Sequence, residues 1–278
     1  MKQKLPLLFL LAASALPAAG PVPDAAGIIR ETVARNEDIL EALRAFHYHR
    51  YREIRWLDST GHVRRTGSTL HDVHIAHGAP YSKLLAEDGV RLDSPALRRE
   101  EQKMARELSR RAARSSSEQR EFQQEMHERR LLMRQLPEAF LWTFHGEASH
   151  AGRPVWILHA RPRPGWRPTT TEARLLTKVA GEIWIDQQLL RMVRIDAHIE
   201  DTFSFAWFLL RIQPGFTFHF EQFLHENREW LPRLATVKGA ARIAGIKTVR
   251  MEIDTQYSNY RRLSGQPPLV AEAKGAAQ

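Results

Sequence analysis

Residues 181–199, GEIWIDQQLLRMVRIDAHI, have the pattern of a β-hairpin, with one strand on each side of a central turn. A second stretch at 215–234, GFTFHFEQFLHENREWLPRL, carries Phe216, Phe218 and Phe220. Because side chains alternate between the two faces of a strand, these three rings share one face. Strands with one aromatic face build either a packed core or a pocket wide enough for a lipid chain.

Other segments show the same alternation. Residues 140–144 and 247–255 place apolar side chains on one face and polar side chains on the other, which is typical of an antiparallel sheet with one dry face. Residues 46–58 and 62–72 are predicted to pair around a turn at 58–61. Most of the chain is therefore expected to form one antiparallel sheet.

Two segments are predicted to be helical. Residues 26–46 repeat apolar side chains at helical spacing, and Asp24 is suited to cap the helix. Residues 94–136 begin with Ser-Pro and are rich in Arg, Glu and Gln, which predicts two helices or one broken helix, solvated except near its end. The fold class predicted is α+β: a strongly curved antiparallel β-sheet, a half-barrel, covered by helices.

The chain has 278 residues, 43% of them hydrophobic, and no cysteine. No disulfide therefore holds the fold, and no lipid-acceptor cysteine is present. Residues 1–20 have a charged start, a short apolar run and small residues, as a secretory signal does. We expect a periplasmic or secreted protein with a domain at 26–262, a helical insertion at about 94–136, and a flexible tail at 263–278.

Motifs that mark catalysis are missing from the sequence. It has no GxSxG elbow, no phosphate-binding loop and no HExxH pattern. His71, His74 and His77 are three residues apart, so on a strand His74 points away from the other two. We expect no catalytic residue, no metal ion and no cofactor. A secreted hydrolase that uses carboxylates, or a metal-binding protein, is the alternative; the carboxylates are Glu182, Asp186, Asp196, Glu200 and Asp201.

The net charge of +9 favours anionic partners. A secretory signal argues against nucleic acid, so lipid head groups or acidic sugars are the expected anionic partners. The dry face of the sheet is either filled by the two helical segments or left partly open as a cavity for acyl chains. Seven aromatic residues are predicted to line that cavity: Phe140, Trp142, Phe144, Trp184, Phe216, Phe218 and Phe220.

The strand GEIWID at 181–186 and the WLP at 230–232, after a signal and an early helix, resemble the LolA/LolB-type family of periplasmic lipoprotein carriers. The resemblance covers about residues 26–262. It implies a half-barrel of about eleven strands closed by helices, and non-enzymatic binding or transport of lipids or lipoprotein acyl chains in outer membrane biogenesis. The charged insertion at 97–136 departs from the plain carriers. It favours an alternative, a structural or stress-sensing module that binds envelope proteins.

Overall fold

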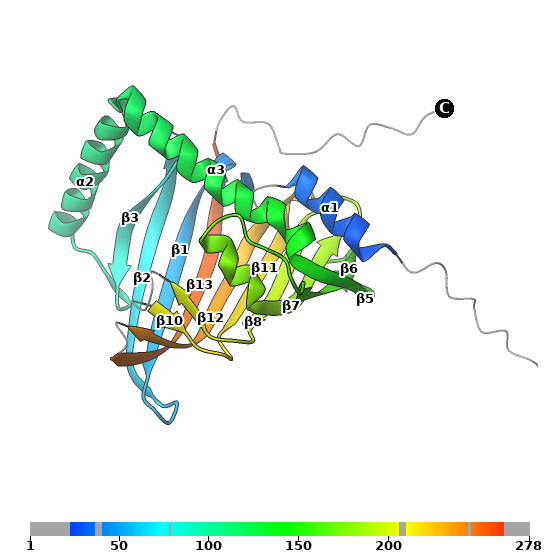
Figure 1. The fold of residues 1–278 in the computed structure, drawn as a ribbon. Helices are drawn as coiled ribbons and strands as arrows, with labels where there is room; N and C mark the ends of the chain where they lie inside the picture. Colours follow the sequence, from blue (N-terminus) through cyan, green and yellow to red (C-terminus); the bar gives the residue numbers. More distant parts are fainter. Residues whose placement is uncertain (1–22, 37–40, 78, 206–209, 244–245, 264–278) are drawn as a thin grey trace, which may run out of the picture.

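The computed structural model describes residues 23–36, 41–77, 79–205, 210–243 and 246–263. In this part of the chain one antiparallel sheet of 13 strands curves around the helices (Figure 1). The predicted signal at 1–20 and almost all of the tail lie outside the described residues. The helices are α1 (Ala25–Arg35), α2 (Ser94–Ala112) and α3 (Ser116–Ala139), with 3₁₀ helices η1 (Glu41–Ala45) and η2 (Glu172–Thr177).

The strands follow an order that is nearly a meander. They are β1 (Phe46–Leu57), β2 (Val63–Ala76), β3 (Ala79–Glu87), β4 (Val90–Arg91), β5 (Phe140–His150), β6 (Arg153–Pro162), β7 (Val179–Asp186), β8 (Met192–Ile199), β9 (Phe203–Phe205), β10 (Leu210–Ile212), β11 (Thr217–His225), β12 (Glu229–Ile243) and β13 (Lys247–Arg262). The order across the sheet is β4-β3-β2-β1-β13-β12-β11-β8-β7-β6-β5, and β10 joins β9 to β12. The largest departure from sequence order is the pairing of β1 with β13, which brings the two ends of the domain together.

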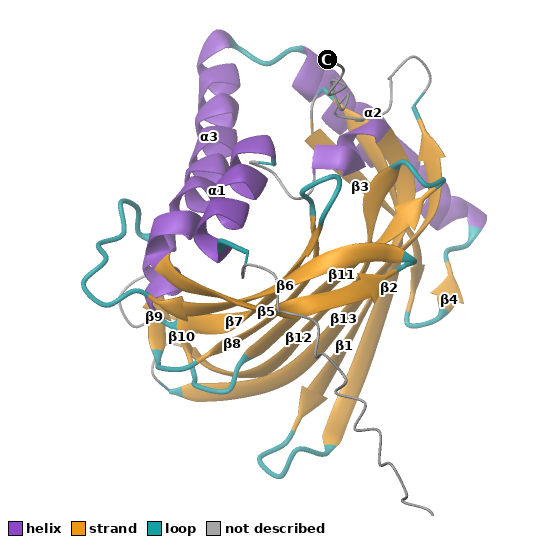
Figure 2. Ribbon diagram, turned by 90° about the vertical axis from the view of Figure 1, so that its right-hand side faces the viewer, coloured by secondary structure: helices purple, strands orange, loops and turns teal. Residues whose placement is uncertain are grey.

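The predicted fold class is confirmed. Figure 2 shows the sheet curling under α1 and α3, with α2 on the other side beside β3. The sheet has more strands than the eleven or so that the family resemblance implies. None of the described helices is long and apolar enough to cross a membrane.

The first helix is shorter than its apolar periodicity predicts. It ends at Arg35, and Asn36 has φ −143°, outside the helical region. The amide of Asn36 donates to the carbonyl oxygens of Thr32 (2.9 Å) and Leu190 (2.5 Å), which fixes this end of α1 on the sheet. Phe46, where the predicted helix and the predicted strand at 46–58 meet, begins β1.

The helical insertion consists of two helices, which is one of the two arrangements predicted. The break falls at 113–115, where Ser115 begins α3 with a capping box: its hydroxyl accepts from the Glu118 backbone N–H (3.3 Å), and the Glu118 carboxylate accepts from the Ser115 N–H (2.8 Å). No residue of α2 is buried. The end of α3 packs on the sheet through Leu132, Met133 and Leu136.

Two neighbouring rows of side chains define the faces of the sheet. The strand registers align an apolar row on the concave side across nine strands: Trp142, Ala160, Gly181, Ala197, Phe218, Val237, Ile253, Ile54 and Gly67. One residue away in every strand lies a polar row on the convex side: Thr143, His159, Glu182, Asp196, His219, Thr236, Asp254, Glu53 and Ser68. Period-two alternation in nine registered strands therefore separates the dry face from the wet one.

The largest core cluster lies where α1 meets the dry face at one end of the sheet. Ile29 and Val33 of α1 pack with Leu158, Ile183 and Ile185 of β6 and β7. Full burial of one such side chain stabilises the fold by about 1.5–3 kcal/mol. This cluster holds α1 in place over β5 to β8.

Candidate binding site between the helices and the sheet

A pocket of about 160 Å³ lies between the end of α3 and strands β5 to β8, and we call it the apolar pocket. Met133 and Leu136 form its helical wall, and Ile183, Ile195 and Ala197 lie on its sheet side. The wall presents apolar surface only. The residues Glu182 and Asp196 border it without contributing polar surface, because their side chains belong to the polar row on the convex face.

A second pocket, the basic pocket, adjoins the first, since Met133 and Met192 line both. It has a volume of about 50 Å³ and is lined by Arg35, Arg191 and Arg228, and also by Glu229. Burial lowers the pKa of the Arg191 guanidinium, while the nearby carboxylates of Glu41 and Glu229 act in the opposite sense. The two pockets thus place guanidinium groups next to an apolar compartment.

The dry face extends beyond the apolar pocket along the apolar row. Phe218, Val237, Ile253 and Ile54 continue this row from β11 to β1, and each is half-buried. The rings of Phe218 and Phe220 lie nearly parallel, 6.4 Å apart. From Gly181 to Ile54 the row crosses five strand spacings of about 4.8 Å, roughly 24 Å in all. We call this half-buried part of the row the trough.

Six of the seven aromatic residues predicted for the cavity lie on or near the dry face. Phe140 and Trp142 line the apolar pocket, and the indole N–H of Trp142 donates to the Leu136 carbonyl (3.2 Å). Phe144 packs against the core cluster beside α1. Phe218 and Phe220 belong to the trough side. Phe216 lies against Gly239 of β12, where an added Cβ would sit 2.5 Å from the Phe216 ring.

Trp184 is on the wrong face for the role that the sequence pattern predicts. It alternates with Ile183 and Ile185, which face the helices, so its ring lies on the convex side. There its indole N–H donates to Glu182 (2.5 Å), and the Arg194 guanidinium lies 4.6 Å from the ring centre. Ile183, Trp184 and Ile185 are all apolar, so the sequence does not show which of them face the helices. The packing of α1 on Ile183 and Ile185 determines it.

The two sequence segments that carry the family resemblance meet at Asp186. Its side chain is fully buried and accepts hydrogen bonds from Arg153 (Nε 2.5 Å, Nη2 3.0 Å) and from the Trp230 indole (3.0 Å). The backbone N–H groups of Gln188 and Leu189 also donate to it (2.8 and 2.7 Å). We call this arrangement the Asp186 joint. It ties the β7–β8 turn to β6 and to β12.

The carboxylates considered for a hydrolase are engaged in ion pairs and hydrogen bonds. Asp196 pairs with Arg194 and with His219 (both 2.6 Å), and Lys178 pairs with Asp201. Glu182 is bonded to His159 (2.8 Å). Together with the Asp186 joint, these contacts give Glu182, Asp186, Asp196 and Asp201 structural partners.

The histidines of β2 do not form one group. The ring of His74 lies 4.7 Å from that of His47, and His74 bonds Asp72 (2.9 Å). His71 is on the other face, near Arg50 and Arg52, where burial and these cations lower its pKa. Two further histidines, His145 and His159, lie close to each other and to Glu182, and the sequence spacing does not single them out because they come from different strands.

Comparison with known proteins identifies similar folds only. No family model matches the chain, and no curated protein matches it. Solved structures similar to it include a putative outer membrane lipoprotein-sorting protein domain from Vibrio parahaemolyticus (10% identity, TM-score 0.31, 87% of this chain and 94% of that one). A LolA superfamily protein from Nitrosomonas europaea is another (11% identity, TM-score 0.31, 88% and 96%).

A third similar structure is the MucA/MucB complex of Pseudomonas aeruginosa (11% identity, TM-score 0.27, 84% of this chain and 98% of that one). The lipoprotein-sorting and LolA-type proteins that the sequence resembles are thus among the structures to which this chain is similar.

Proposed function

We propose that this protein binds lipids or lipoprotein acyl chains without chemical conversion, as a carrier in the periplasm. The observation that supports this most is the all-apolar pocket under α3 that continues into the half-buried trough. Contiguous apolar surface left open in this way is typical of ligand grooves. An acyl chain lying along the apolar row has apolar contacts over its length and leaves the polar row untouched.

The size of the pocket agrees with a partial enclosure of the ligand. A dry apolar cavity of about 150 Å³ accommodates a molecule the size of benzene, so the 160 Å³ pocket holds a short segment of a chain. Burial contributes about 0.8 kcal/mol per methylene, and roughly six buried methylenes give about 5 kcal/mol. A longer chain gains the rest of its affinity from the trough.

The basic pocket provides the polar end of the proposed site. Arg191 lies beside Met192, at the junction with the apolar pocket. A guanidinium group there is suited to a carboxylate or phosphate head group, because charge-assisted hydrogen bonds are stronger where water is partly excluded. We propose that the head group binds here while the chain extends under α3.

Filling the apolar pocket is expected to weaken lipid uptake. The variant Ala197→Phe places a ring between Gly181 and Phe218 on the concave side and displaces at least two methylenes of the ligand. The expected loss of affinity is about 10-fold or more. A fluorescent fatty acid titrated into the purified protein measures it.

The matched control is Thr217→Phe, which adds the same ring to an exposed position on the convex face of β11. Equal affinity of Ala197→Phe and Thr217→Phe would contradict the proposed site, as would failure of the unaltered protein to take up the probe. The methyl ester of the same acid separates chain from head group: it should bind more weakly than the acid if Arg191 recognises the charge.

The alternative function, recognition of an envelope protein, is favoured by α2, which has no buried residue. Arg111 of α2 contacts the sheet by donating to the carbonyl oxygens of Ala79 (3.0 Å) and Pro80 (3.1 Å) of β3. Removing the whole insertion would not separate the two functions, because Met133 and Leu136 of α3 form the pocket wall.

Charge reversal on α2 separates the two functions. Arg99→Glu with Arg106→Glu changes two exposed side chains, so the free energy of unfolding should stay within about 0.5 kcal/mol of that of the unaltered protein. The affinity for fatty acid should be unchanged. Pull-down from an envelope extract then tests the alternative. Loss of a partner with lipid uptake intact would favour protein recognition, and reduced lipid uptake would place α2 within the lipid site.

A further inference from the structure

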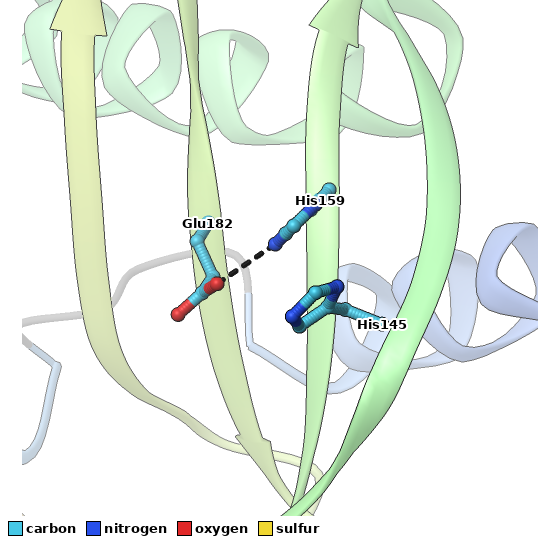
Figure 3. Close-up of side chains that lie close together, drawn as sticks. All are labelled: His145, His159 and Glu182. Atoms are coloured by element: carbon cyan, nitrogen blue, oxygen red, sulfur yellow. Dashed lines mark hydrogen bonds and ion pairs between the residues drawn. The ribbon is translucent and has the colours of Figure 1, made fainter.

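Three side chains on the convex face converge from three neighbouring strands. His145 comes from β5, His159 from β6 and Glu182 from β7, and Figure 3 shows the Glu182 carboxylate bonded to the His159 imidazole, with the His145 imidazole beside it. One nitrogen of each histidine and one carboxylate oxygen lie within 4.8 Å of one another. From this geometry we propose that His145, His159 and Glu182 form a binding site for a divalent transition-metal ion of the zinc type.

The backbone of β5 directs His145 to this place. The pairing of β5 with β6 shifts register between Phe144 and Gly146, so His145 is the extra residue of a β-bulge. A bulge changes the direction of a side chain relative to the regular strand. The ring of His145 thereby stacks on the ring of His159, with centroids 4.0 Å apart and an interplanar angle of 20°.

Glu182 is held in position by groups that leave one oxygen for the metal. Its Oε1 accepts from the Trp184 indole (2.5 Å), and its Oε2 contacts His159 Nε2 (2.8 Å). The neighbouring cation, Arg194, is bound by Asp196 (2.6 Å). A hydrogen bond to the non-ligating atom of a metal ligand is the usual way in which proteins orient it.

The donor set fits zinc chemistry. Two imidazole nitrogens and one carboxylate oxygen are ligands that Zn²⁺ binds at about 2.0–2.2 Å, with water completing a four-coordinate sphere. The bond between His159 and Glu182 would open as the ion enters, because both atoms turn from each other to the metal.

The site has a structural role that follows from its place. β5 is the last strand of the sheet, and on the concave side β5, β6 and β7 carry Trp142, Ala160 and Ile183 of the apolar pocket. An ion bound by one residue from each strand would tie the edge strand to its two neighbours. The metal would thus stiffen the wall of the pocket from behind, whatever ligand the pocket takes.

Zinc binding to the purified full-length protein tests this proposal. After treatment with a chelator, titration calorimetry with Zn²⁺ should show one site, and Co²⁺ at the same site should give visible d–d absorption. His159→Gln and Glu182→Gln should each weaken binding by about 100-fold or more, since loss of even an outer partner costs about 10–100-fold. Zn²⁺ should also slow hydrogen exchange of the β5 amides.

The control is His62→Gln, which alters an exposed histidine in the β1–β2 turn. Equal zinc affinity of the His62 and His159 variants would overturn the proposal, and so would absence of zinc binding by the unaltered protein. Because Glu182→Gln keeps an oxygen for the Trp184 indole, its circular dichroism should match the unaltered chain. His159→Gln alters β6 and Glu182→Gln alters β7, so a folding defect in one variant leaves the other as a test.

Discussion

Replacing Asp186 by alanine is expected to lower the free energy of unfolding by about 3–5 kcal/mol, because it leaves Arg153 without its partner in a buried pair. The side chain of Asp186 is fully buried, and that of Arg153 is 20% exposed. The loss also removes the acceptor of the Trp230 indole and of two backbone N–H groups. Urea unfolding followed by tryptophan fluorescence measures the change.

Asp201→Ala is the control, because it also removes a carboxylate from an ion pair, here with Lys178, but at a site where the Asp201 side chain is 65% exposed. It should cost far less than Asp186→Ala, because exposed ion pairs contribute little to stability. If Asp186→Ala costs no more than Asp201→Ala, the Asp186 joint is not the structural tie between the β7–β8 turn, β6 and β12.

The Asp186 joint is expected to make the stability of the fold fall at low pH. Burial acts to raise the pKa of Asp186, but the bonds from Arg153 and from the Leu189 and Gln188 N–H groups outweigh it and hold the pKa below its usual range. A carboxyl group with a lower pKa in the folded state stabilises the fold above its unfolded pKa of about 3.9. This contribution is lost as the pH falls through the folded value. In Asp186→Asn the corresponding part of the acid destabilisation should be absent.

Much of the sheet could be predicted from alternation, because alternation is a local property of a strand. Phe216, Phe218 and Phe220 needed only their spacing to be placed on one face, and the registers of β11 agree for the last two. Trp184 shows the limit of this reasoning. Its neighbours Ile183 and Ile185 are equally apolar, and the face that becomes buried depends on where α1 packs.

The candidate sites depend on contacts between distant residues. The apolar pocket joins the end of α3 to β5 and β7, and its volume depends on how closely Leu136 approaches the sheet. His145, His159 and Glu182 meet only because three strands pair in one register, with a bulge at His145. No spacing along the chain predicts either arrangement. The Asp186 joint, in contrast, connects the two segments on which the family resemblance rests, 181–186 and 230–232.

The close approach of β7 to β8 makes Gly181 the other position of large expected effect. A Cβ added to Gly181 would lie 2.2 Å from the backbone oxygen of Asp196 and 2.8 Å from Cα of Ala197. Both atoms belong to the backbone of β8, so no side-chain rotation can relieve the overlap. Gly181→Ala is therefore expected to destabilise the fold by about 3 kcal/mol, at the upper end of overpacking effects. Urea unfolding measures it.

The control for Gly181 is Gly152→Ala in the β5–β6 turn. Gly152 has φ +77° and no atom within 4 Å of an added Cβ, so alanine there carries only the backbone cost, about 1 kcal/mol. Because Gly181 and Ala197 both line the apolar pocket, moving β8 away from β7 also reshapes the lipid site. Gly181→Ala should thus lose fatty-acid affinity together with stability, while Gly152→Ala keeps its affinity. A Gly181→Ala protein as stable as Gly152→Ala would show that β7 and β8 do not approach this closely. The described shape of the apolar pocket at Gly181 and Ala197 would then be wrong.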